Sequence, residues 1–243
     1  MVDTNPMLQV KGLKARYGEA QVLNGVTLDV YEGEVVSLLG RNGTGKSTTI
    51  KAIMGMVAVN GGNIHFEGRE VTRYKPHSLA RLGLGYVPEE RRIFGSLSVF
   101  ENLEIVAGIG GAKPWSMEKV LDLFPVLGHR KKHMGKQLSG GEQQMLAMAR
   151  ILRQGGRLLL LDEPTEGLAP IVVQMIGQVI KELKNANLTV LLVEQNLLFT
   201  MDAATRHYII SKGKTVFTGK TGDLKADNEI DRKSTRLNSS HRL

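Results

Sequence analysis

The sequence has 243 residues and no cysteine, and its 32 basic and 24 acidic residues give a net charge of +8. This length is enough for one large domain with its own core, and the missing cysteines exclude disulfides, thiol nucleophiles and cysteine-ligated metal sites. No apolar run approaches the roughly 18 residues of a spanning helix, and the first residues lack the pattern of a signal peptide, so we expect neither.

Short apolar stretches in chain order predict an α/β fold. Residues 8–29 alternate apolar and polar residues between glycines, which indicates an N-terminal antiparallel β layer. The expected apolar strands that follow are residues 35–39, 158–161, 190–193 and 208–210. The clearest amphipathic helices are predicted at 140–153 and 171–184. Continuously apolar strands that alternate with helices are typical of a mainly parallel core sheet covered on both faces.

Residues 91–137 differ from the rest because they are helix-like, basic and interrupted by Pro114 and Pro125. This predicts a helical subdomain inserted into a single domain that covers residues 1–230. The remaining residues, 231–243, resemble the in-frame translation of a sequencing adapter, and we expect an artefactual or disordered tail. The tail holds four basic and one acidic residue, so +5 of the net charge belongs to the domain.

The strand at 35–39 leads into a loop that fits the phosphate-binding pattern G-x-x-x-x-G-K-[ST]. Glycines let backbone N–H groups turn toward phosphate oxygens, and the N-terminus of the following helix adds positive potential. Lys46 is expected to reach the β- and γ-phosphates, and the Ser47 hydroxyl to hold Mg²⁺. The residues predicted to bind a nucleoside triphosphate are Gly40, Arg41, Asn42, Gly43, Thr44, Gly45, Lys46, Ser47 and Thr48.

Two adjacent carboxylates, Asp162 and Glu163, follow the apolar strand at 158–161. Open α/β sheets bind ligands at the carboxyl ends of their strands, so we expect these acids to lie beside the phosphate loop. Asp162 suits the coordination of Mg²⁺, and Glu163 can polarise a water for attack on the γ-phosphate. Neighbouring residues of an extended chain point to opposite sides, which gives the two acids separate roles.

A third motif, LSGGE at residues 138–142, opens the helix predicted at 140–153. Ser139 and Glu142 have the spacing of a capping box, which alone suffices to start a helix. A cap does not require two glycines, which weaken a first turn but let a phosphate approach. With the phosphate loop and the paired carboxylates, this motif makes the chain resemble the ATP-binding-cassette family over about residues 7–230.

The resemblance implies an ATPase that uses ATP and Mg²⁺ in a head-to-tail dimer with a second cassette, identical or related. Tyr17 would stack on the adenine ring. The signature residues would contact the γ-phosphate of ATP held by the other subunit, and they are Ser139, Gly140, Gly141 and Glu142. The helical subdomain would grip integral membrane permease subunits, which places the ATPase peripherally at the cytoplasmic face of the inner membrane.

Three positions depart from the commonest pattern of the family. Glu89 replaces the glutamine of the Q-loop, Ala169 the aspartate of the D-loop and Gln195 the switch histidine. Gln195 can donate a hydrogen bond to the γ-phosphate but carries no titrating proton, so a histidine-based pH dependence should be missing. Glu89 can still face Mg²⁺ or its water. The expected catalytic residues are therefore Glu163 and Gln195, and the expected metal residues are Ser47, Asp162 and Glu89.

The runs VPEERRIF, EGLAP and VEQN resemble one of the two ATPase subunits of branched-chain amino acid importers, and they are similar to urea and amide importers. A cassette acting on DNA or ribosomes is an alternative. Such proteins usually carry a coiled-coil insertion, zinc-ligating cysteines or two cassettes in one chain. A residual charge of +5 without interleaved aromatics predicts no nucleic-acid partner. A kinase would leave LSGGE unexplained, and the sequence leaves the transported solute open.

Overall fold

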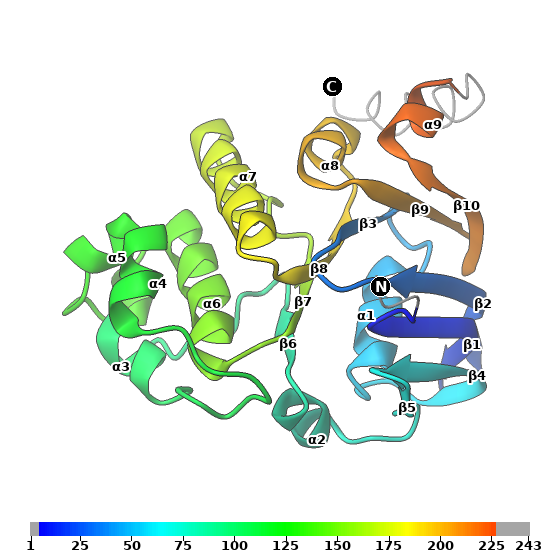
Figure 1. Ribbon diagram of the computed structural model, residues 1–243, viewed down its shortest axis with the longest axis horizontal. Coiled ribbons are helices and arrows are strands. Elements are labelled where there is room, and N and C mark those ends of the chain that lie inside the picture. The colour runs from blue at the N-terminus through cyan, green and yellow to red at the C-terminus, as the bar shows by residue number, and fades with distance from the viewer. Residues whose placement is uncertain (1–4, 227–243) are drawn as a thin grey trace.

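The computed structural model describes residues 5–226, which form two β-sheets and the helices packed on them (Figure 1). The strands are β1 (Leu8–Tyr17), β2 (Ala20–Val30), β3 (Val35–Leu39), β4 (Val59–Phe66), β5 (Arg69–Glu70), β6 (Leu84–Val87), β7 (Leu158–Asp162), β8 (Thr189–Glu194), β9 (Arg206–Ser211) and β10 (Lys214–Lys220). The helices are α1 (Lys46–Ile53), α2 (Pro76–Arg81), α3 (Val99–Glu104), α4 (Met117–Leu123), α5 (Pro125–His129), α6 (Gly140–Gln154), α7 (Pro170–Asn185), α8 (Leu197–Ala203) and α9 (Thr221–Ala226). The tail expected at 231–243 lies outside the described residues.

The strand order confirms the predicted α/β architecture. The N-terminal sheet is antiparallel with the order β2-β1-β4-β5, and the core sheet has the order β10-β9-β3-β8-β7-β6. In the core sheet β9, β3, β8, β7 and β6 run parallel, and β10 pairs antiparallel with β9 at the edge. Because β8 lies between β3 and β7, the carboxyl ends of these three strands meet at one edge of the sheet.

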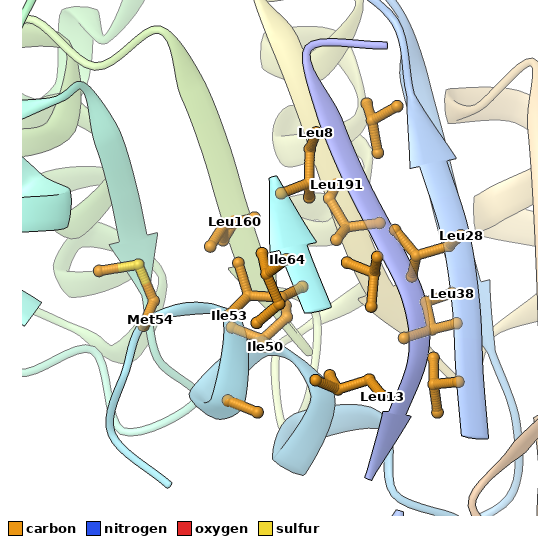
Figure 2. Close-up of a cluster of buried hydrophobic side chains, with 14 of the residues drawn as sticks. Leu8, Leu13, Leu28, Leu38, Ile50, Ile53, Met54, Ile64, Leu160 and Leu191 are labelled. Carbon is orange, nitrogen blue, oxygen red and sulfur yellow. The ribbon is translucent and has the colours of Figure 1, made fainter. Parts of the chain in front are cut away.

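The core sheet is buried on both faces, since alternate residues of its strands enter two apolar clusters. In β7, Leu158 and Leu160 face α1 and the antiparallel sheet, whereas Leu159 and Leu161 face α6 and α7. Figure 2 shows side chains of both sheets and of α1 meeting in the cluster that contains Leu160. The helix that follows the phosphate loop is therefore fixed between two sheets, which gives the loop a rigid base.

The helical region predicted at 91–137 begins later than expected, because α3 starts at Val99. Before it the chain forms a loop in which Arg91 and Arg92 have left-handed φ angles of 63° and 48°. Helices α3, α4 and α5 pack on α6, and buried residues such as Leu103 join the apolar cluster on the outer face of the core sheet. None of the helices within residues 5–226 combines the length and the apolar composition that a bilayer crossing requires.

A buried histidine connects the core sheet to α9. His207 of β9 is fully buried, with Nδ1 2.7 Å from Ser37 Oγ and Nε2 2.8 Å from Thr221 Oγ1. Burial disfavours the charged imidazolium and lowers the pKa of His207 from 6.5 to about 4. The ring is therefore neutral at pH 7 and links two hydroxyl groups from distant parts of the chain.

This depressed pKa predicts that the fold weakens in acid. Between pH 6.5 and about 4 the unfolded chain binds a proton at His207 that the folded chain does not bind. The free energy of unfolding therefore decreases as the pH is lowered, and His207 contributes up to about 3 kcal/mol to this decrease. Urea denaturation over this pH range should show the stability difference between wild type and His207→Gln shrinking on acidification. Exposed His129→Gln is the control, and parallel curves for wild type and His207→Gln would contradict the assignment.

Candidate functional site

The loop between β3 and α1 has the geometry of an anion site. Gly43 and Gly45 have positive φ angles of 75° and 108°, and a Cβ on Gly45 would lie 2.7 Å from Leu23 Cδ2. Only glycine adopts the positive φ at position 45 without strain and also avoids the contact between a Cβ and Leu23. Helix α1 begins at Lys46 without an acidic residue in its first turn and without a side-chain cap. The N–H groups of that turn, which includes Thr48, remain available to a phosphate.

Neighbouring strands hold this loop in place. The Gly213 N–H donates to the Thr44 carbonyl at 3.0 Å, and the Asn24 N–H donates to the Gly213 carbonyl at 2.7 Å. The loop is thus tied to the β9–β10 turn and to β2. Tyr17 ends β1 with 49% of its surface exposed, so its ring is free to stack on a base. Its predicted contact with adenine stays a prediction.

A buried ion pair joins the phosphate loop to the acid after β7. Lys46 Nζ lies 3.1 Å from Glu163 Oε1, and both side chains are more than nine-tenths buried. The Gln195 side-chain amide donates to Glu163 Oε2 at 2.8 Å. The structure therefore brings together the lysine at the start of α1, the expected general base after β7 and the switch glutamine after β8.

The two adjacent acids have separate partners, but the reason expected from the sequence is wrong. Strand β7 ends at Asp162, and Glu163 adopts a left-handed φ of 47°, so the chain turns there and strand alternation does not apply. Glu163 contacts Lys46 and Gln195. Asp162 Oδ2 instead accepts a hydrogen bond from the Tyr86 hydroxyl at 3.2 Å. The turn, rather than the pleat, divides their roles.

Asp162 and Ser47 fit a magnesium site. Asp162 Oδ1 is buried without a hydrogen-bond partner, and Ser47 lies close enough for its hydroxyl to influence the carboxylate. Burial raises the pKa of Asp162, whereas the Ser47 and Tyr86 hydroxyls oppose the shift. Mg²⁺ prefers such oxygen ligands and usually takes one or two carboxylates, with phosphates and waters completing its shell. Among the described residues, no three His, Asp or Glu side chains form a metal cluster by themselves.

Glu89 lies at the edge of the same acidic region. Most of its side chain is open to solvent. The part that is covered loses hydration, and this loss, together with the negative charges of Glu163 and Asp162, raises the pKa of Glu89. Tyr86, three residues earlier, was not identified from the sequence. Burial, reinforced by Asp162, raises the pKa of the Tyr86 phenol, so the hydroxyl stays protonated and donates to the acid. Nothing in the sequence distinguishes this tyrosine from one in the core.

The signature residues open α6 as predicted. Ser139 Oγ accepts from the Glu142 N–H at 3.3 Å, and Glu142 Oε2 accepts from the Ser139 N–H at 2.8 Å, which forms the capping box. Burial opposes ionisation of Glu142, but the Ser139 N–H and the Arg130 guanidinium outweigh it and lower the pKa of Glu142. The Glu142 carboxylate is therefore ionised and already bonded to the Ser139 N–H and to Arg130.

The two glycines of the signature also have a packing reason within the chain. A Cβ on Gly141 would lie 2.6 Å from Val172 Cγ1 of α7, and a Cβ on Gly140 would lie 3.1 Å from Arg91 Nη1. Within residues 5–226, no hydrogen bond or ion pair joins the signature turn to the phosphate loop. Ala169 immediately precedes α7 and supplies no side-chain cap to that helix.

The buried carboxylate of Glu194 was also not expected from the sequence. This residue ends β8 with only 3% of its surface exposed, and its carboxylate accepts hydrogen bonds from Thr165, Gln195 and Asn196. Burial raises the pKa of Glu194, and these hydrogen bonds oppose the shift. An ionisable residue at the end of an otherwise apolar strand was the signal that could have singled it out.

Known proteins resemble this chain in sequence and in fold. Residues 23–166 match the family described as ABC transporter. The chain is 40% identical over 212 residues to the high-affinity branched-chain amino acid transport ATP-binding protein BraG of Pseudomonas aeruginosa, covering 86% of this chain and 91% of that protein. It is 34% identical to the lipopolysaccharide export system ATP-binding protein LptB of Haemophilus influenzae, covering 93% and 95%. The ADP conformation of MJ1267, an ATP-binding cassette of an ABC transporter, has a TM-score of 0.80 at 26% identity, covering 94% and 98%.

Proposed function

Since the chain belongs to the ABC transporter family and is an ATPase of that family, we propose that it drives a branched-chain amino acid importer from the cytoplasmic face of the membrane. The observation that carries this proposal is the 40% identity to BraG over most of both chains, together with the buried contacts among Lys46, Glu163 and Gln195. The 34% identity to LptB favours lipopolysaccharide export as the second candidate.

In this proposal the phosphates of ATP compete with Glu163 for Lys46. The first-turn N–H groups of α1 and the lysine bind the β- and γ-phosphates. This binding draws the Lys46 ammonium away from the Glu163 carboxylate, which lies 3.1 Å from it in the structure. Glu163 is then free to accept a proton from the attacking water, while the Gln195 amide keeps it oriented. Ser47 and Asp162 would hold Mg²⁺, with Glu89 at its water shell, and the ion would neutralise phosphate charge.

We propose that a second cassette completes the site. Ser139 is exposed at the start of α6, a helix of 15 residues, where its hydroxyl and the first-turn N–H groups can meet a phosphate. The carboxylate of Glu142 is already paired with Arg130 and the Ser139 N–H, so it repels an incoming phosphate less than a free carboxylate would. ATP favours the closed dimer and ADP the open one, which supplies the energy for transport.

The proposed permease contact is a groove between α1, α2 and α6. It has a volume of about 360 Å³, an apolar lining that includes Met54, Met56 and Val106, and three cationic side chains, Arg91, Arg92 and Arg150. No acidic side chain of the described chain lines it. This combination fits a short helix of a permease loop that presents apolar residues and a carboxylate.

Reversing one charge at this groove should weaken the permease contact. Arg92 is the most suitable position because its side chain is 60% exposed, and its nearest carboxylate, in Glu90, lies 3.5 Å away. We expect Arg92→Glu to reduce co-purification with the permease by about tenfold, which corresponds to about 1.4 kcal/mol. Exposed Lys181→Glu on α7 is the matched control and should co-purify normally. Arg92→Glu that co-purifies fully, or that loses binding to anionic lipid vesicles without permease, would contradict this assignment.

Solute uptake tests the proposed transport activity. Cells that co-express the chain with the permease subunits of a branched-chain amino acid importer should take up radiolabelled leucine, and Glu163→Gln should abolish this uptake. Urea is the comparison solute for the related importers. Urea uptake without leucine uptake would move the assignment to those importers, and lipopolysaccharide export that depends on Glu163 would favour the second candidate. Tight, salt-sensitive DNA binding without a permease partner would contradict transport altogether.

A further inference from the structure

The carboxylate of Glu194 lies next in the chain to one of the proposed catalytic residues, and within residues 5–226 it forms no hydrogen bond with the side chain of Glu163 or Gln195. It is 3% exposed, and in the described part of the chain its partners are hydrogen-bond donors rather than a cation. A buried carboxylate is costly unless such donors satisfy it. An apolar side chain would fill the position more cheaply but would leave those donors without a partner. The position of the acid therefore calls for an explanation beyond packing.

Each oxygen of Glu194 serves a different loop. Oε1 accepts from the Thr165 N–H at 3.2 Å and from the Thr165 hydroxyl at 2.6 Å, and Thr165 lies in the loop after β7. Oε2 accepts from the Gln195 N–H at 3.1 Å and, at a long 3.5 Å, from the Asn196 N–H, both in the loop after β8. One side chain thus bridges two loops that are otherwise separate in sequence by about thirty residues.

These loops carry the two side chains that must meet at the proposed hydrolytic site. Glu163 has a left-handed φ of 47°, a strained conformation for a non-glycine residue that persists only where surrounding contacts hold it. Its N–H donates to the Val193 carbonyl at 2.9 Å, and its carboxylate accepts from Gln195 at 2.8 Å. The contact of Glu194 with Thr165, two residues further on, fixes the other side of that turn.

We propose that Glu194 is a positioning residue that sets the placement of Glu163 against Gln195 by bridging Thr165 to the backbone at the end of β8. The inference rests on the proposed function, in which Glu163 primes the attacking water. A glutamine at position 194 has the same volume but only one oxygen, so its NH₂ group would face the donors of one of the two loops. Glu194→Gln therefore breaks the bridge without leaving a cavity.

The expected signature is a loss of kcat with little change in KM. Glu194→Gln should lower kcat for ATP hydrolysis by about tenfold to a hundredfold, because a small misplacement of a catalytic group has effects of this size. KM for ATP should stay within about twofold, since Lys46 and the phosphate loop are untouched. Thr165→Val should also lower kcat, whereas Thr165→Ser keeps the hydroxyl and should have a kcat close to that of the wild type. Steady-state phosphate release on the full chain measures all three.

A buried threonine outside the site separates positioning from stability. The Thr200 hydroxyl is fully buried in α8 and donates to the Leu197 carbonyl at 2.8 Å, so Thr200→Val should lower the melting temperature and keep kcat. Unchanged kcat in Glu194→Gln, or equal kcat in Thr165→Val and Thr165→Ser, would overturn the inference. If Glu194→Gln does not fold, the Thr165 pair decides alone. Normal turnover by Glu163→Gln would instead refute the proposed base.

Discussion

Glu163→Gln is expected to lower kcat for ATP hydrolysis by about 10²- to 10⁴-fold, the range for loss of a general base, while ATP still binds. The substitution removes the proton acceptor and keeps the size of the side chain, whose carboxylate lies between Lys46 and Gln195. Because the proposed mechanism makes closure depend on ATP and opening on hydrolysis, the variant should accumulate as an ATP-bound dimer. Phosphate release measures turnover, and light scattering with and without ATP measures the dimer.

The control for this variant is Glu182→Gln, which removes a carboxylate from the exposed face of α7. It should hydrolyse ATP at the wild-type rate and show no trapped dimer. Two results for Glu163→Gln would count against the proposed mechanism. Turnover within a few fold of wild type would show that another group activates the water. Loss of turnover without an ATP-dependent dimer would show that hydrolysis does not take place at a site formed by two cassettes.

Lys46→Ala is expected to abolish ATP binding. The lysine supplies the buried cation at the first turn of α1, and its loss leaves the phosphates beside the carboxylates of Glu163 and Asp162. At an ATP concentration of 100 times Kd the wild type gains about 2.7 kcal/mol of stability. For a domain of this size that raises the melting temperature by roughly 5–10 °C. Lys46→Ala should show no such shift, and thermal unfolding with and without ATP measures it.

A lysine away from the site is the matched control. Lys181 pairs with Asp202 on the surface at 2.7 Å, and Lys181→Ala should keep the full ATP-dependent shift. The comparison is made within each variant, so a change in the stability of the nucleotide-free chain does not affect it. A wild-type-sized shift in Lys46→Ala would mean that the nucleotide binds elsewhere or does not need the lysine.

Periodicity and spacing predicted the parts of the fold that are encoded locally. The apolar strand at Leu158–Asp162 and the capped helix at Gly140–Gln154 carry their own signals, because burial on both faces demands a continuous apolar run and a helix start demands a cap. Strand β4 carried none. Its sequence VNGGNIHF contains two glycines and two asparagines, and it becomes a strand by pairing with β1.

The sequence by itself determined the chemistry available to this protein: a glycine loop before a helix, a lysine and a hydroxyl at its end, and two acids after an apolar strand. Only the tertiary structure decided how they meet. Placing β8 between β3 and β7 brings Gln195 and Lys46 to opposite oxygens of Glu163, and it puts the buried bridge of Glu194 beside them. The physical reason is that strand order and the left-handed turn at Glu163 arise from long-range pairing, which no local pattern of residues records.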